Sequence, residues 1–561
     1  MKQKSITQTL KRCLCMGLSA AMAFAMMPET QARAEDGNPA RAGSVGLTAD
    51  ATTRSQPFER GTGSSTSFGS PSLIVRQVEK NAAGSKPTSG ITTDLIVAAA
   101  EARYGERSST PGQDIIISTS EDGGANWSYG YPLKFEDSQG AAEGAVSISN
   151  PVLVDNETTT NDFVTGGTTY LLVNVAPGTV SNDAGLKSGS GYYSVGEGSS
   201  AVLRLALTND SSKVSNNPVE NTADYPFYVG EMNNGYAPIL KKSDNSDTND
   251  AVDAYFNLYT RTGADAAYTP LTQKQIGSNT DVQQNIFYAA SKYHVYNANY
   301  IVCMMSSDKG ATWSTPEILN ADILRNEQES VSLSVGKGLK TSLNRLVVPI
   351  TSRTNPADQT TSKAAMIWKD VDPNRLAGEP EPKWNRSIED VVLPEAGGEA
   401  EGEEKEPTWA GGGGIVELSS GFLRMFLENG RGSVYYADAD RNSEDKFQFQ
   451  TPVGTNTVST EDARVSAIAY SKNIDGQKAI LGAFPTGMQY TGGMIAVYQR
   501  DEENSTDSTH PTLRKIDEYA IDSTYFSSAC LDEMNYGNNA ALIYQSGVET
   551  VRFQNIQIWD I

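Results

Sequence analysis

Short apolar runs separated by turn-forming residues recur along the chain from about residue 68 onward. The clearest runs lie at residues 73–75, 95–97, 115–117, 170–173 and 202–205. Glycine, asparagine, aspartate and serine gather between them, and no long stretch shows the 3.6-residue period of an amphipathic helix. Runs of this length and spacing are typical of β-strands joined by tight turns. The pattern therefore predicts an all-β fold.

Two turn segments, residues 120–127 and 306–313, share one spacing. A serine is followed by an aspartate two residues later, a glycine four later and a tryptophan seven later. The aspartate can accept hydrogen bonds from the N–H groups of the turn, the glycine can take a positive φ, and the tryptophan can cover the turn. A turn unit that repeats so far along one chain indicates a repeated β architecture, which favours a β-propeller.

Three further regions shape the expected organisation. Residues 179–290 are polar and rich in Asn, Asp and Ser, so we expect long loops or an inserted layer of hairpins there. Residues 386–407 end in an acidic run, which is typical of a solvated loop. The last apolar runs, at 540–544 and 551–559, could pair beside the first strand and close a ring of sheets, which would remove exposed sheet edges.

The amino terminus has the pattern of a secretory signal peptide. Basic residues precede an apolar run at 13–27 that is short for a membrane span, and Ala32-Arg33-Ala34 fits a cleavage site. We therefore expect residues 1–34 to be a signal peptide, 35–66 a disordered linker, and 67–561 the folded domain. This organisation predicts a secreted, periplasmic or cell-surface protein.

Charge and composition narrow the classes of partner. The formal net charge is −23, which argues against nucleic acid and against an anionic membrane surface. Of the four cysteines, only Cys303 and Cys530 lie outside the predicted signal peptide, and we expect two buried thiols rather than a disulfide. The only histidines are His294 and His510, so a histidine-based catalytic triad or zinc site is not expected.

The two turn segments match the Asp-box, S-x-D-x-G-x-T-W, and the chain resembles the sialidases (neuraminidases and trans-sialidases) over about residues 66–561. Asn126 stands in the first box where threonine is usual. Residues 95–104 resemble the family's A-x-A-E-A-R-Y strand, and residues 344–349 its G-R-L-V-V-P strand. Residues 415–423 and 524–545 resemble later family strands, in the family's order. The resemblance implies a six-bladed β-propeller.

The resemblance also implies a chemistry. Sialidases hold the carboxylate of the sugar with three arginines, since a planar guanidinium binds a carboxylate in a bidentate manner. A tyrosine activated by a glutamate attacks the anomeric carbon, and an aspartate acts as acid and base. The family needs no metal or other cofactor for this reaction.

Most of the family's charged positions carry other residues in this chain. The three arginine positions fall on Gly69, on Glu428 and near Gly492, and the activating glutamate falls within residues 411–414, which are all glycine. Arg103 stands where a family substrate-binding arginine stands, so it is the predicted substrate-binding residue. The alternative for Arg103 is a structural ion pair.

Two catalytic positions remain ambiguous. The acid/base register falls on Gly112, which makes Asp114 the nearest candidate carboxylate and Glu106 a second one. The nucleophile register falls on Phe526, and Tyr525 fits after a shift of one residue. We take Asp114 and Tyr525 as the candidate catalytic residues, against structural roles for both.

Two functions follow from this comparison. The resemblance implies a secreted exo-α-sialidase that removes terminal sialic acids, with its arginine triad and catalytic carboxylates eroded. The alternative is a propeller that binds glycans or a surface without hydrolysis. In both cases the expected partners are sialoglycans or other glycans, and we expect a monomer that neither binds nucleic acid nor inserts into a membrane.

Overall fold

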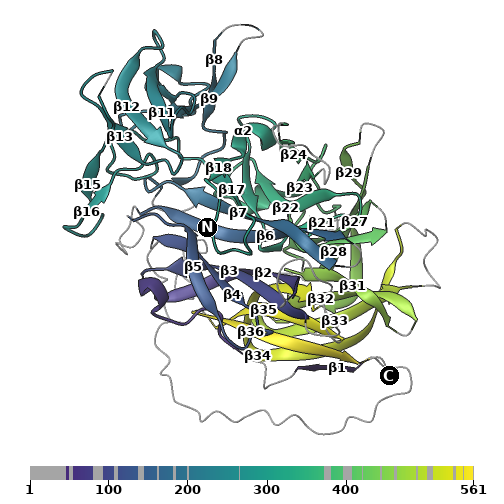
Figure 1. Cartoon of the computed structure of the whole chain (residues 1–561). Coiled ribbons are helices and arrows are strands. Elements are labelled where there is room, and N and C mark those ends of the chain that lie inside the picture. The colour runs from purple at the N-terminus through teal and green to yellow at the C-terminus, as the bar shows by residue number, and fades with distance from the viewer. Residues whose placement is uncertain are drawn as a thin grey trace, which may run out of the picture. The chain divides into compact units, whose positions relative to one another are not determined.

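The structure is a computed structural model of the whole chain (Figure 1). It describes residues 46–49, 55–79, 92–105, 112–136, 145–160, 163–180, 185–196, 198, 201–264, 266–371, 379, 381–395, 407–419, 421–431, 433–441, 445–459, 464–474, 476–487, 490–501, 510–534, 538–547 and 549–559. The predicted signal peptide and the acidic run at 399–406 lie outside these residues.

Within the described residues, the strands of the main body form six antiparallel units of about four strands, as in a six-bladed β-propeller. The first unit comprises β2 (Ser67–Glu79), β3 (Thr92–Arg103), β4 (Gln113–Ser120) and β5 (Ser128–Leu133). The second comprises β6 (Ser147–Thr160), β7 (Phe163–Ala176), β17 (Tyr300–Ser306) and β18 (Glu317–Ile318). The third comprises β19 (Ser330–Leu333), β22 (Arg345–Arg353), β23 (Ser362–Asp370) and β24 (Asn385–Arg386). The all-β propeller predicted from the sequence is therefore confirmed.

The remaining three units complete the ring. The fourth unit comprises β25 (Ala410–Gly411), β26 (Ile415–Ser419), β27 (Phe422–Asn429), β28 (Ser433–Arg441), β29 (Phe447–Phe449) and β30 (Val453–Ser459). The fifth comprises β31 (Ser466–Ile474), β32 (Gln477–Pro485), β33 (Thr491–Arg500) and the first half of β34 (Leu513–Glu533). The sixth comprises the second half of β34 with β35 (Asn539–Ser546), β36 (Thr550–Trp559) and β1 (Gly46–Ala49). The long strand β34 thus belongs to two successive units.

The chain closes the ring by pairing its first strand with its last. β1 runs antiparallel to β36, with Leu47 opposite Ile558, and Ser55 bridges Phe553. Phe58 is buried in the cluster between the last and first units. The β architecture therefore begins upstream of residue 67, within the segment predicted to be a linker.

Hydrophobic clusters fill the spaces between neighbouring units. One cluster packs Leu73 and Ile96 of the first unit against Ile543 and Phe553 of the last. Further clusters lie between the second and third, third and fourth, fourth and fifth, and fifth and sixth units. Because each sheet buries both faces against its neighbours, its strands read as continuous apolar runs rather than as an alternation.

The two Asp-box turns have the expected geometry. In the second, the Asp308 carboxylate accepts from Thr312 N at 2.8 Å and from Thr312 Oγ1 at 2.5 Å, and Trp313 Nε1 donates to the carbonyl of Gly310. In the first, Asn126 replaces threonine, and its Nδ2 donates to Asp122 Oδ2 at 2.7 Å. The asparagine therefore makes the hydrogen bond that the threonine makes in the second turn.

Residues 177–299 are an insertion between two strands that pair directly. β7 and β17 are hydrogen-bonded neighbours, with Val175 opposite Tyr300. The insertion forms its own seven-stranded sheet (Figure 1), which we call the inserted sheet. Its strands are β8 (Tyr192–Val195), β9 (Val202–Leu207), β10 (Phe227–Val229), β11 (Tyr236–Lys241), β12 (Asp247–Asp253), β13 (Leu258–Thr260) and β14 (Thr269–Pro270), followed by the pair β15 (Thr272–Lys274) and β16 (Asp281–Gln283).

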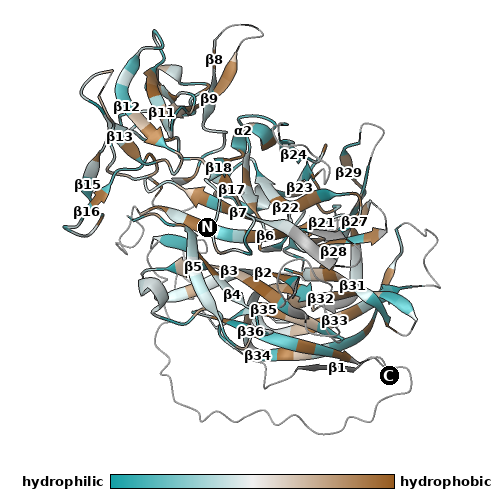
Figure 2. Cartoon of the chain, viewed as in Figure 1, coloured by the Kyte–Doolittle hydropathy of each residue, from teal (hydrophilic) through white to brown (hydrophobic). Residues whose placement is uncertain are grey.

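The inserted sheet shares a core with the second unit. Phe287 and Tyr300 lie at 5.3 Å between ring centroids, and they belong to a cluster that contains Leu171 of β7 and Ile239 of β11. The strand β9 carries a hydrophobic stretch (Figure 2), of which Leu205 and Leu207 are buried in this cluster while Val202 and Leu203 are exposed. The structure thus has a seven-stranded sheet in the region for which the sequence suggested long loops or an inserted layer of hairpins.

Candidate functional site

A cavity of about 690 Å³ lies where the second strands of the units end and the first strands begin. We call it the central pocket. Twelve of its 25 lining residues have hydroxyl or amide side chains, and five are charged. The twelve are Ser70, Gln113, Ser147, Ser149, Asn150, Asn174, Asn299, Ser330, Ser332, Ser334, Thr351 and Gln359. Such a lining offers hydrogen bonds to a ligand with many hydroxyl groups.

Bulges in the first strands aim side chains at this end of the sheets. The register of β2 shifts between Gly69 and Ser72, and Ser70 there has φ 46°. The register of β6 shifts between Ser149 and Val152, and Asn150 has φ 48°. A bulge re-aims a side chain and often lies beside a site. Because both residues line the central pocket, these bulges help to build it.

Arg103, the predicted substrate-binding residue, lines the central pocket at the end of β3. Its Nη2 donates to Glu101 Oε2 at 2.5 Å, and its Nε lies 3.4 Å from Gln113 Oε1. Glu101 is buried and also accepts from Asn150 N at 3.0 Å. Arg103 is therefore both a pocket residue and a member of an ion pair.

The space at Gly69 is taken by this arginine. A Cβ atom built on Gly69 would lie 2.4 Å from Arg103 Nη2. Position 69 is where the family resemblance placed the first arginine of the triad. The guanidinium at this point of the pocket therefore comes from β3 rather than from β2.

Glu428 and Arg464 form a second ion pair in the lining. Arg464 Nε donates to Glu428 Oε1 at 2.7 Å. Glu428 of β27 lies opposite Gly411 of the paired strand β25. Glu428 occupies the place expected for the second arginine of the triad. Arg464, just before β31, supplies a guanidinium next to that place.

Arg353, at the end of β22, is the third arginine of the lining. Its Nε donates to Ser362 Oγ at 2.8 Å and its Nη1 to the carbonyl of Pro356 at 3.2 Å. No carboxylate among the described residues lies within ion-pair distance of it, and Asp358 in the same loop accepts from Thr360 instead. With three arginines and two glutamates, the lining carries a formal charge of +1.

The two candidate catalytic residues do not line the central pocket. Asp114 is fully buried, and its carboxylate accepts from Tyr104 Oη at 2.7 Å and from Phe135 N at 3.0 Å. Tyr525 is half-buried and packs against Tyr490, with ring centroids 6.0 Å apart. The structure brings neither of them together with Arg103.

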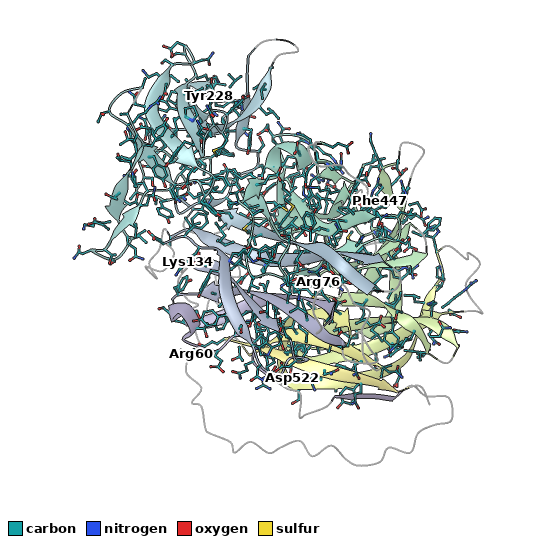
Figure 3. The ribbon with its side chains drawn as sticks, viewed as in Figure 1. Arg60, Arg76, Lys134, Tyr228, Phe447 and Asp522 are labelled. Carbon is teal, nitrogen blue, oxygen red and sulfur yellow. The ribbon has the colours of Figure 1, made fainter. Side chains whose placement is uncertain are left out.

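The alternative nucleophile position, Phe526, has no nucleophilic group, and the alternative acid/base residue is not described. Phe526 is fully buried and stacks on Tyr544 at 4.8 Å, and Glu106 lies outside the described residues. Arg76 and Arg424, which flank expected triad positions in the sequence, are buried in ion pairs with Asp155 and Asp438. Figure 3 labels Arg76 among the propeller strands.

Sequence reasoning did not find Arg353 or Arg464. Arg353 ends the strand that begins with the family-like residues 344–349, and Arg103 ends the second strand of the first unit in the same way. An arginine that closes the second strand of a unit is therefore a usable signal. Arg464 follows a polar stretch and carries no comparable signal.

The two cysteines outside the predicted signal peptide are in the described part of the chain. Cys303 and Cys530 are both buried and unpaired, as predicted. Among the described residues, no group of three or more His, Cys, Asp or Glu side chains could hold a metal ion. In the same part of the chain, no helix has the length and apolar character needed to cross a membrane.

Six β-sheet units in a ring, Asp-box turns and a polar pocket at the strand ends define a propeller of the sialidase type. No family model matches the chain. In sequence, the chain is similar to anhydrosialidase of Macrobdella decora, with 25% identity over 496 residues, and to sialidase B of Streptococcus pneumoniae, with 22% over 438 residues. These matches cover 81% and 74% of this chain but only 56% and 55% of the two relatives.

Solved structures agree on the fold. The NanB sialidase from Streptococcus pneumoniae superposes with a TM-score of 0.65 and 20% identity, covering 91% of this chain and 71% of that one. The intramolecular trans-sialidase from Ruminococcus gnavus, solved with oseltamivir carboxylate, superposes with a TM-score of 0.64 and 21% identity, covering 92% and 99%. The chain thus has a propeller fold of the sialidase type.

Proposed function

We propose that the central pocket binds the terminal sialic acid of a glycan, in a protein whose hydrolysis of sialosides is far slower than that of an active sialidase. The observation that carries this proposal is the set of three arginines in a lining of hydroxyl and amide groups. Guanidinium groups suit the carboxylate of the sugar, and the hydroxyl and amide groups suit its glycerol and ring hydroxyls.

Arg353 is the proposed principal contact for the carboxylate. Its hydrogen-bond partners are a hydroxyl and a carbonyl, and among the described carboxylates Asp358 attracts it only from beyond ion-pair distance. Arg103 and Arg464 are each paired with a glutamate, so they contribute less net charge to an incoming anion. Their paired glutamates can accept hydrogen bonds from sugar hydroxyls.

Slow hydrolysis is expected because, within the described part of the chain, neither candidate catalytic residue lines the central pocket. A retaining sialidase needs a nucleophile and an acid/base group at the anomeric centre. Asp114 is buried away from the central pocket, and Tyr525 packs on Tyr490. A carboxylate without access to the ligand cannot exchange a proton with it.

The relatives support the ligand class. Two of the similar structures hold oseltamivir carboxylate and 2,7-anhydro-Neu5Ac, both carboxylate ligands. The signal peptide predicted for residues 1–34 supports a secreted or surface location, which we propose together with a monomeric state and no cofactor. Binding of a different acidic sugar is the competing outcome of the tests below.

A turnover assay tests the catalytic part of the proposal. The mature protein should release fluorophore from 4-methylumbelliferyl α-sialoside at less than about one hundredth of the rate of a sialidase control, since an acid/base group contributes about 10²–10⁴-fold and loss of a nucleophile costs more. Efficient turnover that Tyr525→Phe or Asp114→Asn abolishes would show that these residues reach the substrate, and would overturn the proposal.

A further inference from the structure

We propose that the inserted sheet carries a second binding site, for a sugar that bears a carboxylate. The site is a shallow cavity of about 350 Å³ lined by residues 222–223, 226–227 and 241–243. We call it the lysine groove. It shares no lining residue with the central pocket, so it is a separate site on the same chain.

The groove is built by a short helix and two paired strands. The turn η6 (Thr222–Asp224) leads into β10, and β10 pairs with β11, which ends at Lys241. Lys242 N donates to the carbonyl of Pro226 at 2.8 Å and so ties the end of β11 to the start of β10. Figure 3 labels Tyr228 of β10 to mark this part of the inserted sheet.

Two lysines supply positive charge at the groove. The Lys242 ammonium lies 4.0 Å from the ring centroid of Tyr193, and partial burial lowers the pKa of Lys242. Within the described residues, neither Lys241 nor Lys242 forms an ion pair. The nearby Asp244 carboxylate accepts from Ser246 N at 3.0 Å, within its own turn, and attracts Lys241 from beyond ion-pair distance.

The rest of the lining suits a sugar ring rather than an inorganic anion. Ala223, Pro226 and Phe227 make up the apolar part of the lining, and Thr222 and Ser243 add hydroxyl groups to it. A pyranose can place its apolar C–H face against apolar residues and its hydroxyls against polar ones. On a chain with a net charge of −23, lysines without ion pairs beside apolar lining residues favour a ligand that is both anionic and amphipathic.

This inference rests on the proposed function, because the second site would take the same class of ligand as the central pocket. A glycan surface that carries many acidic sugars could then engage both sites. Two weak sites on one chain raise the overall avidity without new contacts, provided both can be reached together. The lysine groove would act as an anchor on the glycan surface.

A binding assay with separable variants tests the second site. The variant Lys241→Met/Lys242→Met removes both ammonium groups and keeps their aliphatic stems. Its binding to a multivalent sialylated polymer should fall on the order of tenfold, while binding of monovalent methyl α-sialoside to the central pocket should stay unchanged. Lys274→Met, on the exposed strand β15, removes a charge elsewhere on the inserted region and should leave both unchanged.

The remaining outcomes separate the two proposals. If Arg353→Ala still binds the polymer and the lysine double variant does not, the second site is supported. This holds even if the central pocket binds no sialoside. Wild-type polymer binding by the lysine double variant would overturn the second site. If the lysine double variant lost binding to an acidic peptide polymer to the same extent, the second site would also be overturned. The groove would then recognise negative charge and not a sugar.

Discussion

At the level of single residues, the arginine side chain at position 103 lies in the space that the absent side chain of Gly69 leaves in the central pocket. The glycine removes a side chain from β2, and the arginine of β3 fills that space. A guanidinium is therefore present in a region where the family motif would place one, but it comes from the neighbouring strand. The role of a residue in this pocket cannot be read from alignment with the family motif alone.

Restoring the family arginine by Gly69→Arg should not restore sialidase activity. A Cβ at position 69 would collide with Arg103 Nη2, so the substitution should displace Arg103 from Glu101. The guanidinium can move aside, so the cost is its lost contact with the buried Glu101, about 1.5–3 kcal/mol, which thermal melting can measure. Gly69→Ala is the matched control, because it adds only the colliding atom. A gain of turnover with Gly69→Arg would contradict this interpretation.

The two Asp-box turns allow a second test at this scale. Asp308→Ala should destabilise the protein by about 1 kcal/mol, because it removes an acceptor for the turn N–H groups. Asn126→Thr should change stability by less than about 0.5 kcal/mol, since the asparagine already makes the equivalent hydrogen bond. Chemical denaturation of both variants checks these values.

The pH dependence of the Asp308 contribution has a defined sign. The side-chain hydrogen bond from Thr312 leads the causes that lower the pKa of Asp308. A lowered pKa in the folded state means that the contribution is present above the ordinary value of about 3.9 and is lost as the pH falls through the lower, folded value. If the difference in unfolding free energy between wild type and Asp308→Ala grew as the pH was lowered, this sign would be contradicted.

At the level of elements, the sequence predicted most of the strands and the order of the ring. The Asp-box spacing and the family-like strands place turns and strands correctly because they depend on local backbone geometry. The pocket could not be predicted in the same way. Each bulge in β2 and β6 shifts the register, and a shift of one residue moves a side chain to the other face of a strand.

Asp114 illustrates this limit. It begins an apolar strand, and its neighbours Ile115, Ile116 and Ile117 are all buried, so alternation of polar and apolar residues gives no information on where its side chain points. The structure turns it toward Tyr104 and Phe135. The pairing of β7 with β17 across the insertion was likewise beyond sequence reasoning, because it joins residues more than a hundred positions apart.

The strand β6 carries a titratable group that should affect stability. Burial raises the pKa of Asp155 to about 8, with Arg76 and Lys337 opposing this and Glu157 and Asp532 adding to it. A raised pKa means that the stabilising contribution is present below about pH 4 and is lost as the pH rises through about 8. Melting temperatures of the wild type should therefore fall more between pH 5 and pH 9 than those of Asp155→Asn. Parallel curves for the two proteins would contradict this prediction.

At the level of the whole molecule, the charge distribution agrees with recognition of an acidic sugar. The chain carries a net charge of −23, yet the central pocket has a lining charge of +1 and the lysine groove holds two unpaired lysines. Local positive charge in a negative protein restricts anion binding to these places. Nonspecific binding of nucleic acid or anionic membrane is correspondingly disfavoured.

The core of the propeller lies apart from the central pocket. Every space between neighbouring units holds a hydrophobic cluster. The same scaffold can therefore carry different residues in the pocket, and the function has to be argued from the pocket itself.

The most direct test of the central claim is a titration of wild type and Arg353→Ala with methyl α-sialoside, with the free sugar measured in the same samples. The wild type should bind saturably and release no free sialic acid while a sialidase control hydrolyses the ligand completely. One charged contact contributes about 1.5–3 kcal/mol, so Arg353→Ala should bind at least about tenfold more weakly. Undiminished binding by Arg353→Ala, or efficient release of sialic acid by the wild type, would contradict the account.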